Sequence, residues 1–213
     1  MGTSAPTPHP DTRDSLLEAG LACFAKYGYD ATSIRLIASM AGKNSSLIAY
    51  YFKSKEGLYR EAFKYMLDRF RGCERLEPVE PPLADPKERL ARHFRRLLNQ
   101  VEDHLRSRNP VQQQAARLFL SEMQCPKEEV KDLILERIAP AVQEIRDCLK
   151  AIRPGMAEAD LAFWGITLQG MCMALSLHRE MNKLAWPCAD HTLSLEVTAD
   201  RLASFACKGL GEP

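Results

Sequence analysis

The sequence predicts an all-α protein, with a small N-terminal domain of three helices followed by a larger helical domain. Apolar residues recur at spacings of three and four along most of the chain, which is typical of amphipathic helices. No segment of useful length alternates apolar and polar residues as a half-buried strand would. Prolines and glycines separate the periodic segments, as expected of helix boundaries. A chain of 213 residues is long enough to bury a sizeable core.

The N-terminal domain is expected to span residues 12–60. Residues 1–11 are small, polar and proline-rich, and we expect them to be a disordered tail. The first helix should run from about Thr12 to Tyr27, because Leu17, Leu21 and Phe24 form an apolar stripe along it. Gly28 should end this helix.

Two short helices are expected between Thr32 and Lys55. Ile34, Ile37 and Ala38 give the first an apolar face, and Thr32 or Ser33 can cap its start. Gly42 follows at the place where a tight turn needs a left-handed residue. Asn44 or Ser45 can cap the second helix, which should bury Leu47, Ile48 and Phe52 and expose Ser45, Ser46, Ala49 and Tyr50. Two helices joined in this way predict a helix-turn-helix.

Charge is distributed unevenly over the chain. The whole sequence has 29 Lys and Arg against 28 Asp and Glu, yet residues 32–55 contain four basic residues and no acid. Local positive charge interleaved with hydroxyls and amides favours contact with DNA phosphates and base edges, although a solvated helix that merely lacks acids is the alternative. Phosphate contacts are expected from Thr32, Arg35, Lys53 and Lys55, base contacts from Ser45, Ser46 and Tyr50, and either from Lys43 and Tyr51; Ser33, Asn44 and Ala49 complete the candidate surface.

A family resemblance supports this reading. The stretch from about Arg13 to Phe63 resembles the N-terminal domain of the TetR family of bacterial regulators, and its amino-acid sequence is most similar to a CecR-like subgroup. One position departs from the family, since Ala49 stands where many members have a tyrosine. The matching residues are Phe24, Gly28, Thr32, Ile37-Ala38, Ala41-Gly42, Tyr50-Tyr51-Phe52, Ser54-Lys55 and Leu58-Tyr59.

The second domain is expected to span residues 61–213. A helix starting near Ser54 should leave the first domain, and a proline-rich stretch over residues 74–85 should be a linker. Apolar periodicity and Pro or Gly boundaries then predict helices over about 85–107, 110–124, 126–153, 161–178 and 193–210.

Residues 161–178 contain no charged residue and approach the length of a membrane span. We expect burial on several sides instead, because Thr167, Gln169 and His178 interrupt the run in an otherwise charged helical protein. The resemblance implies that helices over about 160–184 and 192–210 pair with a second copy to form a homodimer. Such a dimer would place two recognition helices on double-stranded DNA, and no membrane partner is expected.

The resemblance also implies that the middle helices, over residues 87–180, enclose a cavity for a small-molecule effector of unknown identity. Aromatic and Met side chains tolerate varied apolar guests, but at helical spacing they more often form plain core. The candidate lining residues are His93, Phe94, Arg117, Phe119, Met123, Phe163, Trp164, Gln169, Met171, Met173 and His178.

No arrangement typical of an enzyme appears in the sequence, which has no phosphate-binding glycine loop, no catalytic triad spacing and no metal-ligand cluster. Glu122, Glu128 and Glu129 are expected to be solvated rather than paired acids. No cofactor, catalytic residue or metal site is therefore expected. The seven cysteines are scattered, which favours a reducing cytoplasm, with a redox switch as an alternative role. The expected function is a transcriptional regulator, and more specifically a repressor, that binds a pseudo-palindromic DNA operator as a dimer and is released by a small apolar or amphipathic effector. The alternative is an all-helical interaction protein, or a regulator without a small-molecule ligand.

Overall fold

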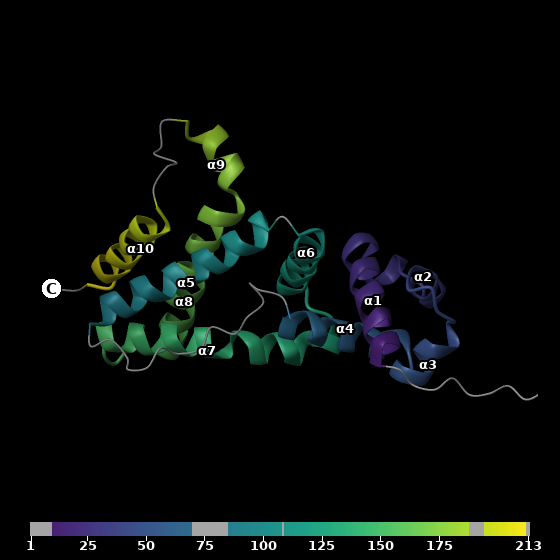
Figure 1. The fold of residues 1–213 in the computed structure, drawn as a ribbon. Helices are drawn as coiled ribbons and strands as arrows, with labels where there is room; N and C mark the ends of the chain where they lie inside the picture. Colours follow the sequence, from purple (N-terminus) through teal and green to yellow (C-terminus); the bar gives the residue numbers. More distant parts are fainter. Residues whose placement is uncertain (1–9, 70–84, 108, 188–193, 212–213) are drawn as a thin grey trace, which may run out of the picture. The chain divides into compact units, whose positions relative to one another are not determined.

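The computed structural model describes residues 10–69, 85–107, 109–187 and 194–211. Within these ranges all regular secondary structure is helical (Figure 1), which confirms the predicted fold class. The predicted tail lies outside the described residues up to residue 9, and α1 already includes Pro10 and Asp11; most of the predicted linker is also outside them. The helices are α1 (Pro10–Ala31), α2 (Ile34–Met40), α3 (Ser46–Phe52), α4 (Lys55–Arg69), α5 (Pro86–Arg106), α6 (Pro110–Gln124), α7 (Glu128–Ile152), α8 (Glu158–Leu177), α9 (Arg179–Ala185) and α10 (Leu195–Gly209).

The chain folds into two compact units. The first unit combines residues 1–74 with residues 107–134, and the second combines residues 75–106 with residues 135–213. The predicted division at residue 60 therefore differs from the compact units. The reason is that α1 packs against α6 as well as α4, so a helix far along the chain completes the N-terminal core. Which unit performs which task stays a prediction.

The first unit is built around α1. Leu17, Leu21 and Phe24 are buried on its inner face, as the apolar stripe predicted. Helical geometry is interrupted at Gly28, which has φ 78°, and the segment continues to Ala31. The ring of Tyr59 from α4 packs edge-on against Phe24, with 4.8 Å between ring centroids. The short helix α2 packs against α1, and α3 packs against α4.

The second unit has its core between α5, α8, α10 and the later part of α7. Leu90 and Phe94 of α5, Leu149 of α7 and Leu168 of α8 are all fully buried there. Ala203 lies on the buried face of α10, which packs along α5. The predicted apolar helix over 161–178 corresponds to α8, whereas the segment 160–184 expected at the dimer interface is divided, because α8 ends at Leu177 and α9 begins at Arg179.

Helix α8 is far less buried than the sequence suggested. Among the described residues it is the one helix long and apolar enough to cross a membrane, and only 22% of that apolar window is buried. Phe163 is 64% exposed and Ile166 is 73% exposed. The expectation of burial on several sides is therefore wrong for the single chain, since one side of α8 presents large apolar side chains to the surroundings.

Candidate DNA interface and effector pocket

Helix α2 is closed at both ends by local hydrogen bonds. The Ser33 hydroxyl accepts a hydrogen bond from the backbone N–H of Leu36, at 3.1 Å, as an N-cap does. At the other end, Lys43 N–H donates to the Ala38 carbonyl at 2.9 Å and Gly42 N–H donates to the Ser39 carbonyl at 3.1 Å. This is the Schellman arrangement, and its left-handed residue is Gly42 at φ 63°. The turn of the helix-turn-helix thus forms where the sequence predicted it.

Helix α3 presents one apolar and one polar face. Asn44 caps it, because its Oδ1 accepts a hydrogen bond from Ser46 N–H at 2.9 Å. Ile48 and Phe52 are buried against the rest of the unit. Ser46 and Tyr50 are exposed on the opposite face. A helix of seven residues is marginal by itself, so its two buried side chains hold it in place.

A tight junction joins α3 to α4. Lys53 has φ 70° and ψ −50°, and Ser54 N–H donates to the Phe52 carbonyl at 2.8 Å. These angles and this bond define a γ-turn of the strained, positive-φ kind. Gly57 fits directly behind it, since a Cβ at that position would lie 2.1 Å from the Phe52 oxygen. The exposed Lys53 side chain is therefore held at a sharp corner of the backbone.

Most of the residues predicted to contact DNA are exposed to solvent. Lys55 is half-buried and engaged, with its Nζ 4.2 Å from the Tyr29 ring centroid and 3.5 Å from the Asp30 carbonyl oxygen. Tyr51 is also half-buried, and its ring lies 5.0 Å from that of Tyr50. The exposed candidates are Ser33, Arg35, Lys43, Asn44, Ser45, Ser46, Ala49, Tyr50 and Lys53.

Thr32 is the exception and requires a correction. Its side chain is only 2% exposed, and its hydroxyl lies 2.6 Å from the Gly28 carbonyl and 3.2 Å from the Cys23 carbonyl. A hydroxyl that already donates to backbone carbonyls inside the fold cannot serve a phosphate. Thr32 instead ties the start of α2 to the end of α1.

Helix α4 is anchored to the α6–α7 corner by a buried acid. The Tyr59 hydroxyl donates to Glu122 Oε1 at 2.6 Å, and Lys127 N–H donates to Glu122 Oε2 at 2.8 Å. Burial, and then the bond to Glu122, raises the pKa of Tyr59 well above its usual range, so the phenol stays a donor. Glu122 is 4% exposed, so the expectation that it is solvated is wrong.

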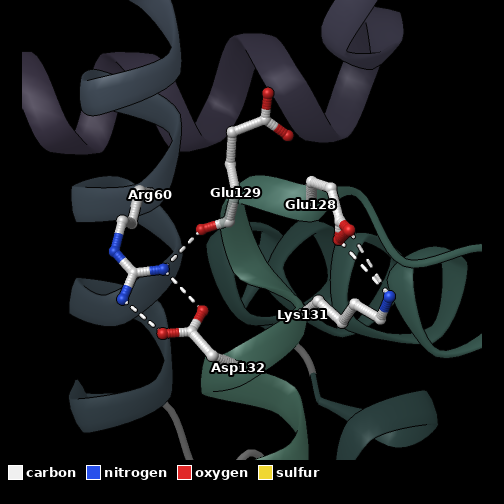
Figure 2. A network of polar contacts seen from close by, with 5 residues as sticks. All are labelled: Arg60, Glu128, Glu129, Lys131 and Asp132. Carbon is white, nitrogen blue, oxygen red and sulfur yellow. Dashed lines mark hydrogen bonds and ion pairs between the residues drawn. The ribbon is translucent and has the colours of Figure 1, made fainter.

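A second anchor lies one residue further along α4. Figure 2 shows the Arg60 guanidinium facing the first turns of α7, where both of its terminal nitrogens bond Asp132 at 2.6 Å. The same guanidinium donates to the Glu129 carbonyl at 2.6 Å. The hydrogen bond from Arg60 lowers the pKa of Asp132 to about 2. Glu128 is exposed and pairs with Lys131 at 3.4 Å (Figure 2), in keeping with the solvated role predicted for it.

The second unit contains a pocket of about 800 Å³. Its walls come from α5, α8, α9 and α10, with Trp186 just beyond α9. Of the residues predicted to line an effector cavity, only Met171 lines this pocket. The lining residues are Leu98, Glu102, Met171, Ala174, Leu175, Ser176, Arg179, Asn182, Trp186, Leu195, Thr198, Arg201, Leu202 and Phe205.

The other predicted lining residues lie elsewhere. Arg117, Phe119 and Met123 belong to α6 in the first unit, where the Phe119 ring packs on Phe63 with 6.4 Å between centroids. Phe94 is part of the second unit's core. Phe163 and His178 are exposed, whereas Trp164, Gln169 and Met173 are half-buried away from the pocket lining.

His93 takes part in a buried charged cluster instead of a ligand site. It is fully buried, and its Nδ1 lies 3.0 Å from Glu144 Oε2. Arg96 and Arg92 lie 3.7 and 3.9 Å from the same carboxylate. Burial opposes the ionisation of Glu144, but His93, Arg96 and Arg92 outweigh it and hold its pKa below its usual range.

The N-terminal part of the chain matches known regulators. Residues 16–62 match the model of bacterial regulatory proteins, tetR family. The chain is 34% identical over 79 residues to the HTH-type transcriptional repressor NicS of Pseudomonas putida, a match that covers 37% of this chain and 36% of NicS. It is 45% identical over 56 residues to the HTH-type transcriptional dual regulator CecR of Shigella flexneri, which covers 26% of this chain and 25% of CecR.

These matches thus span about a third of NicS and a quarter of CecR, and the CecR-like subgroup stays a prediction. The fold likeness extends further along the chain. The crystal structure of a TetR-like transcriptional regulator from Rhodococcus sp. RHA1 has a TM-score of 0.57 at 21% identity, over 96% of this chain and 98% of that one. Both curated relatives have the names of regulators rather than of enzymes.

Proposed function

We propose that this chain, whose residues 16–62 match the tetR family of bacterial regulatory proteins, is a cytoplasmic, ligand-responsive transcriptional repressor that binds a pseudo-palindromic operator as a homodimer. The observation that carries the proposal is the outer face of α3. Hydroxyl and phenol groups are exposed there on a helix docked by Ile48 and Phe52, inside a stretch that has no acidic residue between 32 and 55.

In this proposal α3 lies in the major groove and reads base edges with Ser45, Ser46 and Tyr50. Arg35 and Lys53 are exposed cations that neutralise phosphates on either side of the groove. Lys55 can add a phosphate contact only if it leaves the Tyr29 ring.

The homodimer rests on exposed apolar surface in the second unit. Phe163 and Ile166 on α8, and Phe205 on α10, are each more than half exposed. Large contiguous apolar surface on a protein in water marks an interaction site or an aggregation hazard. A second copy related by a two-fold axis would cover these helices and place two α3 helices on successive half-sites.

Release from DNA would follow from unequal effector affinity for two conformations, because a ligand shifts an equilibrium only by that difference. Residues 128–134 of α7 belong to the first unit, where Asp132 holds Arg60 of α4, and the remaining residues of α7 belong to the second unit. Displacement of α7 would therefore be felt by α4, and through α4 by the spacing of the two α3 helices.

The test is fluorescence anisotropy of the full chain on DNA from upstream of its own gene, against scrambled competitor at two salt concentrations. Arg35→Ala should weaken binding to all sequences and lower the slope of log affinity against log salt by about 0.9, because one phosphate contact is lost. Ser46→Ala should change the sequence preference and leave that slope unchanged. If the upstream DNA does not bind, sequences are selected from a pool of random DNA by their binding to the protein. Weak affinity that is equal for the selected sequences and for scrambled DNA would contradict the proposal.

A further inference from the structure

The pocket of the second unit has the size and walls of a small-molecule site. Its volume of about 800 Å³ lies within the range of about 300–1,000 Å³ that is usual for organic ligands. Leu98, Leu195 and Leu202 supply aliphatic wall, and the rings of Phe205 and Trp186 supply aromatic wall. Such a lining favours a guest with a substantial apolar body.

The charged groups of the pocket do not balance. Glu102 and Arg179 form an ion pair at 2.8 Å and largely neutralise one another. The guanidinium of Arg201, one turn from Thr198 along α10, forms no hydrogen bond or ion pair with any residue in the described part of the chain. The acids nearest to it along α10 are engaged elsewhere, since Glu196 and Asp200 lie 3.6 and 3.7 Å from Arg95. One uncompensated positive charge therefore borders an apolar pocket.

We propose that this pocket binds an amphipathic carboxylate, with its apolar body against the leucine and aromatic walls and its carboxylate on Arg201. The inference rests on the proposed function, because it names the chemical class of the effector. A guanidinium offers a carboxylate two parallel N–H donors, and the bond is charge-assisted. Arg201 is exposed, so water screens part of that attraction, and the apolar walls supply the rest of the affinity by holding the body of the guest.

The charge pattern also separates this class from others. A cationic amphiphile would leave Arg201 uncompensated and would have to compete with Arg179 for Glu102. A neutral alcohol could occupy the same walls but would gain no ion pair. A single negative charge on an apolar body matches the one unbalanced cation.

Matched probe pairs test the proposal by isothermal titration calorimetry on the full chain. The pairs are decanoate with decanol, and 2-naphthoate with 2-naphthalenemethanol. At neutral pH at least one carboxylate should bind about tenfold more tightly than its own alcohol, as a charge-assisted hydrogen bond implies. Arg201→Gln should remove that preference and leave the affinity for the alcohol unchanged.

Two further variants serve as controls. Arg153→Gln, at an exposed arginine that does not line the pocket, should keep the preference. Thr198→Trp, at a half-buried lining position, should obstruct part of the pocket and weaken the binding of both members of each pair. The proposal is overturned if neither carboxylate binds, if carboxylates and alcohols bind equally, or if Arg201→Gln keeps the preference.

Operator binding by the same preparations, measured by anisotropy without any probe, distinguishes this failure from failure of the proposed function. Intact operator binding without carboxylate binding would discard the effector class alone. Absence of sequence-specific DNA binding by the parent chain would contradict the proposed function as a transcriptional regulator, whatever the pocket binds.

Discussion

Helices α3 and α8 both leave one face uncovered within their own compact unit, and the two faces differ in chemistry. The seven residues of α3 bury Ile48 and Phe52 and expose Ser46 and Tyr50. The twenty residues of α8 bury Leu161, Leu168 and Cys172 and expose large apolar side chains such as Ile166. A face of hydroxyls and phenols suits the polar edges of DNA, whereas an apolar face suits another protein surface.

The largest expected effect follows from placing a charge on the apolar face of α8. Ile166→Glu should yield a monomer, because a carboxylate would be desolvated in the dimer interface. Operator affinity should fall by about 100-fold or more, since two linked half-site contacts become independent. Sedimentation velocity and anisotropy measure the two effects. Gln124→Glu, an exposed change on α6, is the control, and an Ile166→Glu dimer with parental affinity would refute the assignment of this face.

A smaller effect, on stability, is expected from removing the hydrogen bond between Tyr59 and Glu122 in the first unit, which contains α3. Tyr59→Phe removes the phenol that donates to the buried Glu122 carboxylate. We expect the free energy of unfolding to fall by about 1–2 kcal/mol, because a buried acceptor loses a partner. Urea denaturation measures the change. Tyr27→Phe, at a tyrosine that is 42% exposed, should leave stability unchanged; equal midpoints for both variants would show that the anchor contributes nothing.

Lys53→Gly separates charge from backbone strain at the corner after α3. Glycine accepts φ 70° readily, so the free energy of unfolding should rise by up to about 1 kcal/mol. DNA affinity should nevertheless fall, and the salt slope should decrease by about 0.9 with the lost phosphate contact. Lys64→Ala on the exposed side of α4 should leave the slope unchanged. An unaltered slope for Lys53→Gly would remove Lys53 from the DNA interface.

The smallest effect concerns acid stability of the second unit. The folded-state pKa of Glu144 is depressed, so its stabilising contribution is complete above the usual pKa of 4.5 and is lost as the pH falls through the folded value. Glu144→Gln should therefore flatten the dependence of the urea midpoint on pH between about pH 5 and pH 3.5. Glu136→Gln, exposed on the same helix, is the control. Parallel profiles for parent and Glu144→Gln would contradict the assigned linkage.

Local pattern predicted much of the fold because helices depend on neighbours three and four residues apart. Both the turn at Gly42 and the buried face of α3 could be predicted from such local spacing. The burial of Thr32 could not be predicted, since a hydroxyl before a helix looks the same in sequence whether it faces solvent or the Gly28 carbonyl. Glu122 was missed for a related reason, as its partner Tyr59 lies 63 residues away.

The pocket of the second unit was the least predictable part of the molecule. Composition singled out aromatic and Met residues, but the same residue types fill the core at Phe94 and face outward at Phe163. The pocket is bordered instead by ordinary residues such as Leu98 and Thr198. Those residues come together only through the packing of α10 on α5, which no local spacing encodes.

The packing of α1 against α6 has a consequence for how such chains can be recombined. Because α6 and the start of α7 complete the same compact unit as α1–α4, the unit that we propose to bind DNA is discontinuous in the gene. A chimera that joins residues 1–74 to the remainder of another regulator would pair α1 with a foreign α6. Exchange of operator specificity therefore requires grafting two separate segments, or only the exposed residues of α3, rather than a single N-terminal cassette.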